Sequence, residues 1–213
     1  MFVDLLLPAL WETVYMSAVS TVLAVLIGTI PAIILVLSDK NGLSPHPALY
    51  RVLDIIINIL RSFPFIILMI VLFPLTKIIV GKSIGTTAAI VPLTIGAAPF
   101  VARLIENSLK EVDIGVIEAA QAFGATNLQI VFKIMMVEAL PGIIAGITLT
   151  LITLVGFSAM AGAVGGGGLG DVAIRYGYHR FNTDVMLVTV LVLVALVQCF
   201  QLVGDYLYKK TKK

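Results

Sequence analysis

Charge is scarce in this sequence of 213 residues: Asp, Glu, Lys and Arg together make up 12% of it, about half of their usual share in soluble domains. Hydrophobic residues make up 60%. A soluble fold of this length needs far more charge to cover its surface, and a disordered chain is rich in charge and poor in apolar residues. The composition therefore excludes both classes and predicts a membrane protein.

Cysteine is almost absent as well. Because Cys199 is the only one, the chain can form no intrachain disulfide, no cysteine-based metal site and no redox pair. Cys199 lies in an apolar run, and we expect a small buried side chain there. The net charge of +2 is too small to indicate a nucleic-acid partner.

Long uncharged stretches dominate what is present. Five of them cover 113 of the 213 residues, and about 20 helical residues cross a hydrocarbon core of roughly 30 Å. The run 62–76 is short, so we extend that span back to residue 54, which places Asp54 and Arg61 near its inner end. Residues 165–170 are nearly all glycine and are not expected to continue a helix. The sequence thus predicts an all-α membrane protein, one domain over 1–213 with five transmembrane helices at about 13–37, 54–76, 83–102, 139–164 and 185–207.

The basic residues give an orientation. The N-terminal residues lack the basic segment of a signal peptide, so we expect the first span to be retained. With the C-terminal lysines inside, nine Lys and Arg fall on the inner side and four on the outer side, leaving Arg61 uncounted. Since inner loops carry the excess of Lys and Arg, the chain is predicted to be N-out and C-in.

The inner segment 103–138 carries eight of the chain's 26 charges and is too long for a loop without structure of its own. Within it, 114–123 has a helical composition, and the spacing of Ile117, Ala120 and Phe123 predicts that they line one face. Gly124 follows where a helix is expected to end.

A second helix is predicted directly after this glycine. Thr126 and Gln129 have the spacing of a capping box, and Leu128, Val131 and Met135 then recur at three- to four-residue intervals. The segment is therefore expected to form a helical hairpin, either packed at the membrane surface or used to dock a partner.

Residues 118–124, Glu-Ala-Ala-Gln-Ala-Phe-Gly, followed by Ile134 after nine residues, resemble the EAA loop of ABC-importer permeases. The family's closing Leu-Pro is replaced by Met136 and Val137, and a Leu-Pro pair occurs four residues later. In that family the loop inserts a short coupling helix into a groove of the ATP-binding subunit. The resemblance assigns ATPase coupling to Glu118, Ala119, Ala120, Gly124, Ala125, Thr126 and Gln129.

The resemblance extends over most of the chain. Glu12-Thr13, Arg61-Ser62-Phe63-Pro64 and the segments 118–141 and 156–178 are similar to permeases of methionine importers, and 158–171 is the main ground for methionine. It implies a type I ABC importer permease fold in the cytoplasmic membrane of a bacterium, and a homodimer with two ATPase subunits. It further implies a substrate-binding (lipo)protein outside, D- or L-methionine as substrate, and a translocation subunit that is not itself an enzyme. No cofactor is expected in this chain, because the partner ATPase would bind ATP and Mg²⁺.

Other functions fit the residues less well. Residues 165–170 match G-x-G-x-x-G, but a dinucleotide site needs a preceding strand and an acid about 20 residues on, whereas here a span precedes. Ser158 and His179 do not form a serine-protease pattern, because 156–160 lacks the second glycine of G-x-S-x-G. The main alternative is an ion-coupled secondary transporter or channel. Such proteins usually carry ionisable groups at mid-membrane, and four of the five apolar runs have none.

The fourth span supplies candidates for the translocation path. Its glycines and threonines form a small-residue stripe typical of close helix packing. Towards its outer end Met160 is the one bulky side chain between Ser158 and Gly162. A flexible thioether could close a narrow pore or contact a thioether substrate, so these three residues are predicted to line a path or gate, with ordinary packing as the alternative.

Overall fold

The computed structural model describes residues 2–212, with the side chains of residues 2 and 3 excepted. Within that range the chain is helical and contains no strand. The elements are α1 (Phe2–Ser38), α2 (Pro47–Ser62), α3 (Phe65–Val71), α4 (Phe73–Val80), α5 (Thr86–Lys110), α6 (Ile114–Ala122), α7 (Asn127–Ile130), the π-helical turn η1 (Val131–Met135), α8 (Met136–Glu138), α9 (Leu140–Ala163), α10 (Gly168–Val172), the π-helical turn η2 (Ala173–Tyr178) and α11 (Thr183–Thr211).

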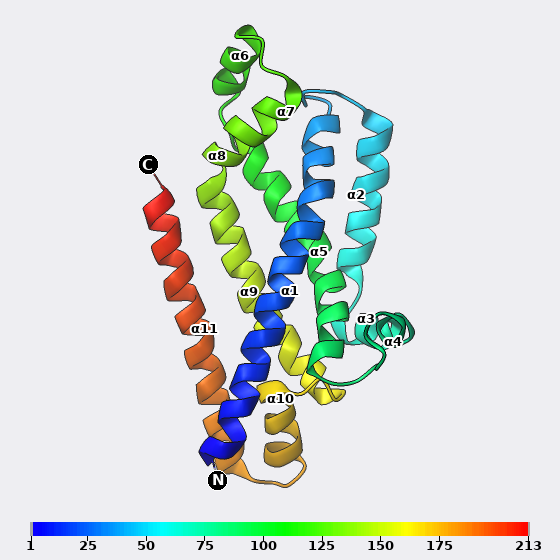
Figure 1. Cartoon of the computed structure of the whole chain (residues 1–213), viewed down its shortest axis with the longest axis vertical. Coiled ribbons are helices and arrows are strands. Elements are labelled where there is room, and N and C mark those ends of the chain that lie inside the picture. The colour runs from blue at the N-terminus through cyan, green and yellow to red at the C-terminus, as the bar shows by residue number, and fades with distance from the viewer. Residues whose placement is uncertain (1, 213) are drawn as a thin grey trace.

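Long helices form an elongated bundle (Figure 1). In the most apolar part of α5, 67% of the residues are buried inside the chain, against 11% in α11. Helix α5 is therefore the centre of the bundle, packed between α1 and α9, while α2 and α11 lie on its flanks. Pro92 and Pro99 lie inside α5, and spans tolerate such prolines when neighbouring helices support the freed backbone groups.

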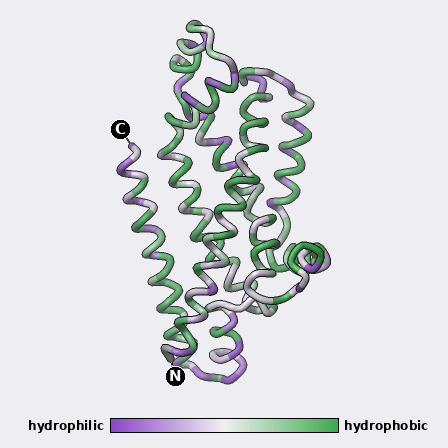
Figure 2. The backbone as a smooth tube through the Cα atoms, viewed as in Figure 1, coloured by the Kyte–Doolittle hydropathy of each residue, from purple (hydrophilic) through white to green (hydrophobic). Residues whose placement is uncertain are grey.

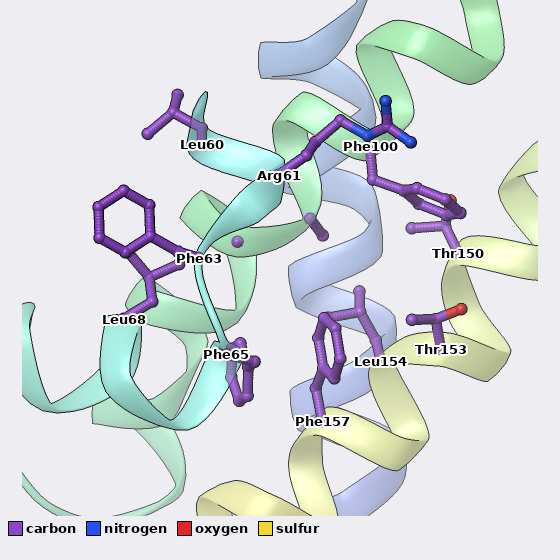
Figure 3. A pocket seen from close by; sticks show the side chains of 12 residues that line it. Leu60, Arg61, Phe63, Phe65, Leu68, Phe100, Thr150, Thr153, Leu154 and Phe157 are labelled. Carbon is purple, nitrogen blue, oxygen red and sulfur yellow. The ribbon is translucent and has the colours of Figure 1, made fainter. Parts of the chain in front are cut away.

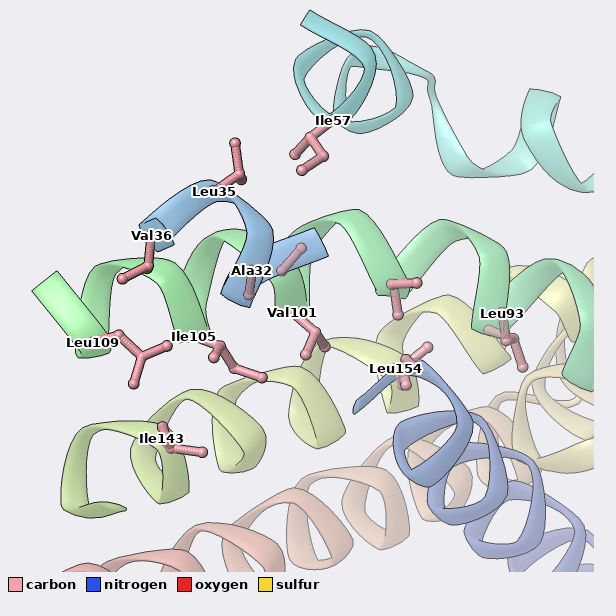
Figure 4. Close-up of a cluster of buried hydrophobic side chains, with 14 of the residues drawn as sticks. Ala32, Leu35, Val36, Ile57, Leu93, Val101, Ile105, Leu109, Ile143 and Leu154 are labelled. Carbon is pink, nitrogen blue, oxygen red and sulfur yellow. The ribbon is translucent and has the colours of Figure 1, made fainter. Parts of the chain in front are cut away.

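The core of the bundle is a continuous layer of aliphatic side chains between α1, α5 and α9 (Figure 4). Leu93, Val101 and Ile105 of α5 contribute to it with Leu35 of α1 and Leu154 of α9, and all five are almost completely buried. Burial of such side chains stabilises each by about 1.5–3 kcal/mol in water. Inside a membrane, close van der Waals packing between the helices supplies this stabilisation in place of the hydrophobic effect.

The middle parts of the long helices are apolar on their outer faces too (Figure 2). Four helices, α1, α5, α9 and α11, are long and apolar enough to cross a membrane, and a fifth span results if the bent pair α2 and α3 is taken as one. Cys199 lies on the outer face of α11 and is exposed. The expectation of a buried cysteine was therefore wrong, because α11 buries few of its side chains in this chain.

The expected continuous span over 54–76 is not one helix. It consists of the end of α2, the short α3 and the start of α4, and α2 and α3 meet at an angle of 100°. The break falls at Phe63 and Pro64. Proline has no backbone N–H and disfavours helical geometry in the preceding residue, so a helix tends to end there.

Other expected boundaries shift by a few residues or by whole turns. The span expected at 83–102 is α5, which continues to Lys110, so the first eight residues of the expected loop 103–138 belong to this helix. The span expected at 139–164 is α9, which ends at Ala163, as the glycines after it predict. Helix α1 starts at Phe2, well before the expected residue 13.

The two ends of the bundle differ in construction (Figure 1). At one end α6 and α7 project beyond the long helices, and the C-terminus lies on the same half. At the other end lie the N-terminus, α10 and η2. The chain ends therefore point in opposite directions along the bundle, as an odd number of spans requires.

Candidate functional site

The segment between α5 and α9 forms the predicted helical hairpin. Asp113 caps α6 by accepting a hydrogen bond from the backbone N–H of Gly115 at 2.7 Å. Gly124 follows α6 with φ of +78°, a conformation that side chains with a Cβ rarely adopt. Thr126 and Gln129 form both hydrogen bonds of the capping box at the start of α7. The turn and the capping box are both confirmed.

The structure separates the seven residues assigned to coupling into an inner and an outer group. Ala120 is buried against the core and Ala125 is half-buried. The other five are exposed on the outside of the hairpin: Glu118, Ala119, Gly124, Thr126 and Gln129. Glu118 forms no ion pair with any other residue that the structure describes. Its carboxylate is thus available to a partner.

Two expected faces of the hairpin helices were partly wrong. Phe123 was expected beside Ala120, but α6 ends at Ala122, and the Phe123 side chain beyond it is 92% exposed. Leu128, Val131 and Met135 have the spacing of one helix face, but Leu128 is exposed whereas the other two are buried. The π-helical turn η1 interrupts the α-helical repeat after α7, so side-chain positions before and after it fall on different faces.

The hairpin is firmly attached to the bundle on its inner side. Ile130, Val131 and Met135 are buried in the main core, and the side-chain amide of Asn127 donates to the backbone carbonyl of Leu43 at 3.1 Å. The hairpin is therefore packed into the core of the bundle and hydrogen-bonded to the loop between α1 and α2.

A cluster of polar side chains lies beneath the hairpin, where α2 and α5 meet the loop after α1. We call it the charge cluster: Asp39, Tyr50, Asp54, Arg103, Glu106 and Lys110. Glu106 is 1% exposed and lies at its centre. It pairs with Arg103 at 2.7 Å and with Lys110 at 2.8 Å.

The outer members of the charge cluster connect three elements. Arg103 also pairs with Asp54 of α2, and Lys110 pairs at 2.7 Å with Asp39, just after α1. The hydrogen bond from Lys110 holds the pKa of the Asp39 carboxyl below its usual value. Sequence reasoning missed this cluster, although Arg103, Glu106 and Lys110 have the three- and four-residue spacing that places side chains on one helix face.

The three path candidates in α9 do not lie together. Ser158 is buried, and its hydroxyl donates to the carbonyl of Val155 at 2.7 Å. Gly162 is buried where α9 meets α10, since a Cβ there would lie 2.3 Å from the backbone nitrogen of Asp171. Met160 instead lies on the opposite, exposed face with Gly156 and Ala163. Of the three, Met160 alone is placed to face a path outside this chain.

The glycine-rich segment after α9 is folded rather than open. Gly168–Val172 form the short helix α10, which is buried against α1 and α9. Helix α1 provides the hydrogen-bond acceptors for its first turn. The carboxylate of Glu12 accepts from the N–H of Gly168 at 2.7 Å, and the hydroxyl of Thr13 accepts from the N–H of Leu169 at 2.9 Å. The sequence gives no spacing signal for this contact, because 156 residues separate the partners.

No cluster of three or more His, Cys, Asp or Glu suited to a metal ion occurs among residues 2–212. The charge cluster contains three carboxylates, but each of them already pairs with Arg103 or Lys110. Its chemistry is that of a structural ion-pair network.

Comparison with known proteins gives consistent results. The family model for the binding-protein-dependent transport system inner membrane component matches residues 24–213. The probable D-methionine transport system permease protein MetI of Vibrio cholerae is 55% identical over 207 residues, which cover 97% of this chain and 92% of that protein. The methionine import system permease protein MetP of Bacillus subtilis is 44% identical over 197 residues, covering 92% and 89%.

A solved structure also resembles the whole chain. A native crystal form of the MetNI methionine ABC transporter, described as inward facing, contains a chain with 47% identity and a TM-score of 0.96, covering 98% of this chain and 97% of that one. The match includes the bent α2–α3 pair and the hairpin, because nearly every residue is covered. By its sequence and its fold, the chain belongs to the family of binding-protein-dependent transport system inner membrane components.

Proposed function

We propose that this chain is the membrane-spanning permease of an ATP-driven importer of methionine. Two copies would form the translocation path, because five spans are few to enclose one and a symmetric pair solves this with a single chain. Two ATPase subunits would dock on the hairpins, and a substrate-binding protein would deliver the amino acid at the end formed by α10 and η2. The names of the relatives and the match to a methionine transporter support this proposal.

The observation that carries the docking role is the exposed apolar surface of the hairpin. Phe123, Leu128, Ile114 and Val116 are exposed there, at the end of the bundle that projects beyond the long helices (Figure 1). Several exposed apolar side chains on a capped element, together with the unpaired carboxylate of Glu118 on α6, are typical of a protein–protein interface.

The hairpin's attachment indicates how ATPase motion reaches the path. ATP and Mg²⁺ would be bound by the partner subunits, and closure of these subunits would move the docked α6 and α7. Because η1 continues into α8 and α9, and the charge cluster joins α5 to α2, this movement would tilt the spans together. The path would then alternate between openings at its two ends.

The test is purification of the tagged chain in mild detergent, followed by reconstitution into liposomes. We expect an ATPase to co-purify in equal amount, and methionine uptake to require ATP inside and the binding protein outside. Uptake by the chain alone, driven by an ion gradient, would support a secondary transporter instead.

A charge reversal tests the docking surface itself. We expect Glu118→Lys to abolish ATP-driven uptake and to weaken co-purification of the ATPase, while the variant still inserts into the membrane. Glu111→Lys makes the same change at an exposed carboxylate in the same segment, outside α6, and is expected to transport normally. Equal uptake by both variants would contradict the docking role of Glu118.

A further inference from the structure

The bend between α2 and α3 opens a cavity of about 260 Å³. We call it the bend cavity, and its lining comes from α2, α3, α5 and α9 (Figure 3). Ala97 and Phe100 lie near the middle of α5, and Thr150 and Thr153 lie near the middle of α9. The cavity is therefore level with the centre of two spans.

Arg61 lines the bend cavity and provides its only charge. The sequence placed Arg61 near the inner end of a span, but α2 already begins at Pro47, and Arg61 near its end lies level with the middle of α5 and α9. No acidic side chain in residues 2–212 pairs with it, and Figure 3 shows it extended towards Phe100. A charged group at this depth is costly and is usually kept for a functional role.

The remaining polar groups of the cavity are acceptors. The Thr150 hydroxyl donates to the carbonyl of Gly146 and the Thr153 hydroxyl to that of Leu149, each at 2.8 Å. Their protons are thereby used within α9. Thr150 is completely buried, so of the two hydroxyls only that of the half-buried Thr153 is open to a ligand, and its oxygen can still accept. Leu60 also lines the cavity, and its carbonyl lacks the usual helical donor because Pro64 has no N–H.

The rest of the lining is apolar and largely aromatic. Phe65 of α3 and Phe157 of α9 stack in parallel with ring centroids 4.3 Å apart, and Phe63, Leu68 and Leu154 complete the wall. Such a surface suits an unbranched apolar chain or a thioether, which contacts aromatic rings favourably.

These features combine into a recognition pattern, and we propose that the bend cavity binds the transported amino acid during its passage. The guanidinium of Arg61 holds the carboxylate, the Thr153 hydroxyl oxygen and the Leu60 carbonyl receive the ammonium group, and the aromatic wall contains the apolar side chain. This inference rests on the proposed function, since it takes an amino acid to be the substrate.

Direct occupancy is tested with a photoreactive diazirine analogue of methionine added to the complete transporter in nanodiscs. After illumination, we expect mass spectrometry to find the label on peptides that contain residues 60–68 or 150–157. Excess methionine should suppress the labelling. Label found only elsewhere, or label that methionine does not displace, as when a lipid headgroup occupies Arg61, would overturn the proposal.

The role of Arg61 is tested with variants of the reconstituted transporter. Arg61→Met keeps a long apolar side chain but removes the charge. We expect the methionine concentration for half-maximal uptake to rise at least about tenfold, because the loss of a hydrogen bond to a charged group weakens binding by about that factor. Arg61→Lys should recover part of the loss. Arg51→Met, on the same helix but outside the bend cavity, should behave like the wild type.

Failure of this inference is distinguishable from failure of the proposed function. If the wild type takes up methionine with ATP and Arg61→Met does so with unchanged concentration dependence, the bend cavity is not a substrate site. If the wild type takes up no methionine at all, the proposed function itself is wrong. Co-purification of the partner subunit in the same amount as with the wild type, measured for Arg61→Met, shows that the variant is assembled.

Discussion

At the scale of single residues, the buried charges have the largest consequences. Glu106 is inaccessible to solvent, and its carboxylate neutralises two cations from its own helix. Tyr50 of α2 adds a hydrogen bond from its hydroxyl at 3.2 Å. Without Glu106, Arg103 would keep only Asp54 as an ion-pair partner and Lys110 only Asp39. Each cation would then lose one charged acceptor, and the Tyr50 hydroxyl would lose its acceptor as well.

We therefore expect Glu106→Ala to destabilise the protein by about 1–3 kcal/mol. The reason is that Arg103 and Lys110 lose their shared partner beneath the hairpin. The measurement is the thermal unfolding of the detergent-purified complex. Glu111→Ala, at an exposed carboxylate one turn further on, should change stability by no more than about 0.5 kcal/mol. Similar unfolding curves for the two variants would show that the charge cluster is not stabilising.

Met160 is the single side chain that we expect to act as a gate of the translocation path. It is the one large side chain on the exposed stripe of α9 formed with Gly156 and Ala163. If it closes a path between two copies, Met160→Ala should increase the leak of methionine from loaded proteoliposomes in the absence of ATP. Met160→Leu has a similar volume and should leak no more than the wild type. An unchanged leak in Met160→Ala would reduce the residue to a packing role.

At the scale of elements, the hairpin depends on one backbone conformation. Gly124 has positive φ, and nothing lies within 4 Å of the position that a Cβ would occupy. A larger residue at position 124 is therefore disfavoured by the positive φ that it would have to adopt, and not by steric contact with neighbouring atoms. Asn tolerates this conformation far better than a β-branched residue does.

This difference yields a matched pair of variants. Gly124→Val should distort the turn at a cost of about 1–3 kcal/mol and should greatly reduce ATP-driven uptake, because α6 no longer presents its outer face correctly. Gly124→Asn should retain most of the uptake. The measurement is initial uptake rate in proteoliposomes at equal amounts of assembled complex. Equal rates for Val and Asn would mean that the turn geometry does not govern coupling.

At the scale of the whole molecule, the two ends of the bundle must face different compartments. The excess of Lys and Arg on the hairpin side favours the N-out and C-in orientation. Tyr178 lies exposed near α10, and Gln121 lies exposed on α6 at the opposite end.

Thiol labelling in whole cells tests this orientation. In a Cys199→Ser background, Tyr178→Cys should react with a membrane-impermeant maleimide in intact cells. Gln121→Cys should react only after the membrane is permeabilised. The reverse pattern would contradict the orientation and would place the hairpin away from any cytoplasmic ATPase.

The sequence predicted those features that depend on local chemistry. Uncharged runs located α1, α5, α9 and α11, since a span must bury its backbone polar groups within one helix. Thr126, Gln129 and Gly124 located the capping box and the turn, because both involve residues a few positions apart.

The tertiary structure decided the rest, because it depends on contacts between residues distant in the sequence. Glu12 binds the first turn of α10, and Arg103 pairs with Asp54. Neither contact produces a periodic pattern in the sequence from which it could be predicted. Pro64 could be recognised as a helix breaker, but the 100° bend and the contacts of α3 with α5 and α9 are seen only in the tertiary structure. The same holds for the position of Arg61 level with the middle of α5 and α9. The sequence by itself determined that the chain spans a membrane and carries a docking hairpin. Only packing decided which charges meet, and which one stays unpaired beside the bend cavity.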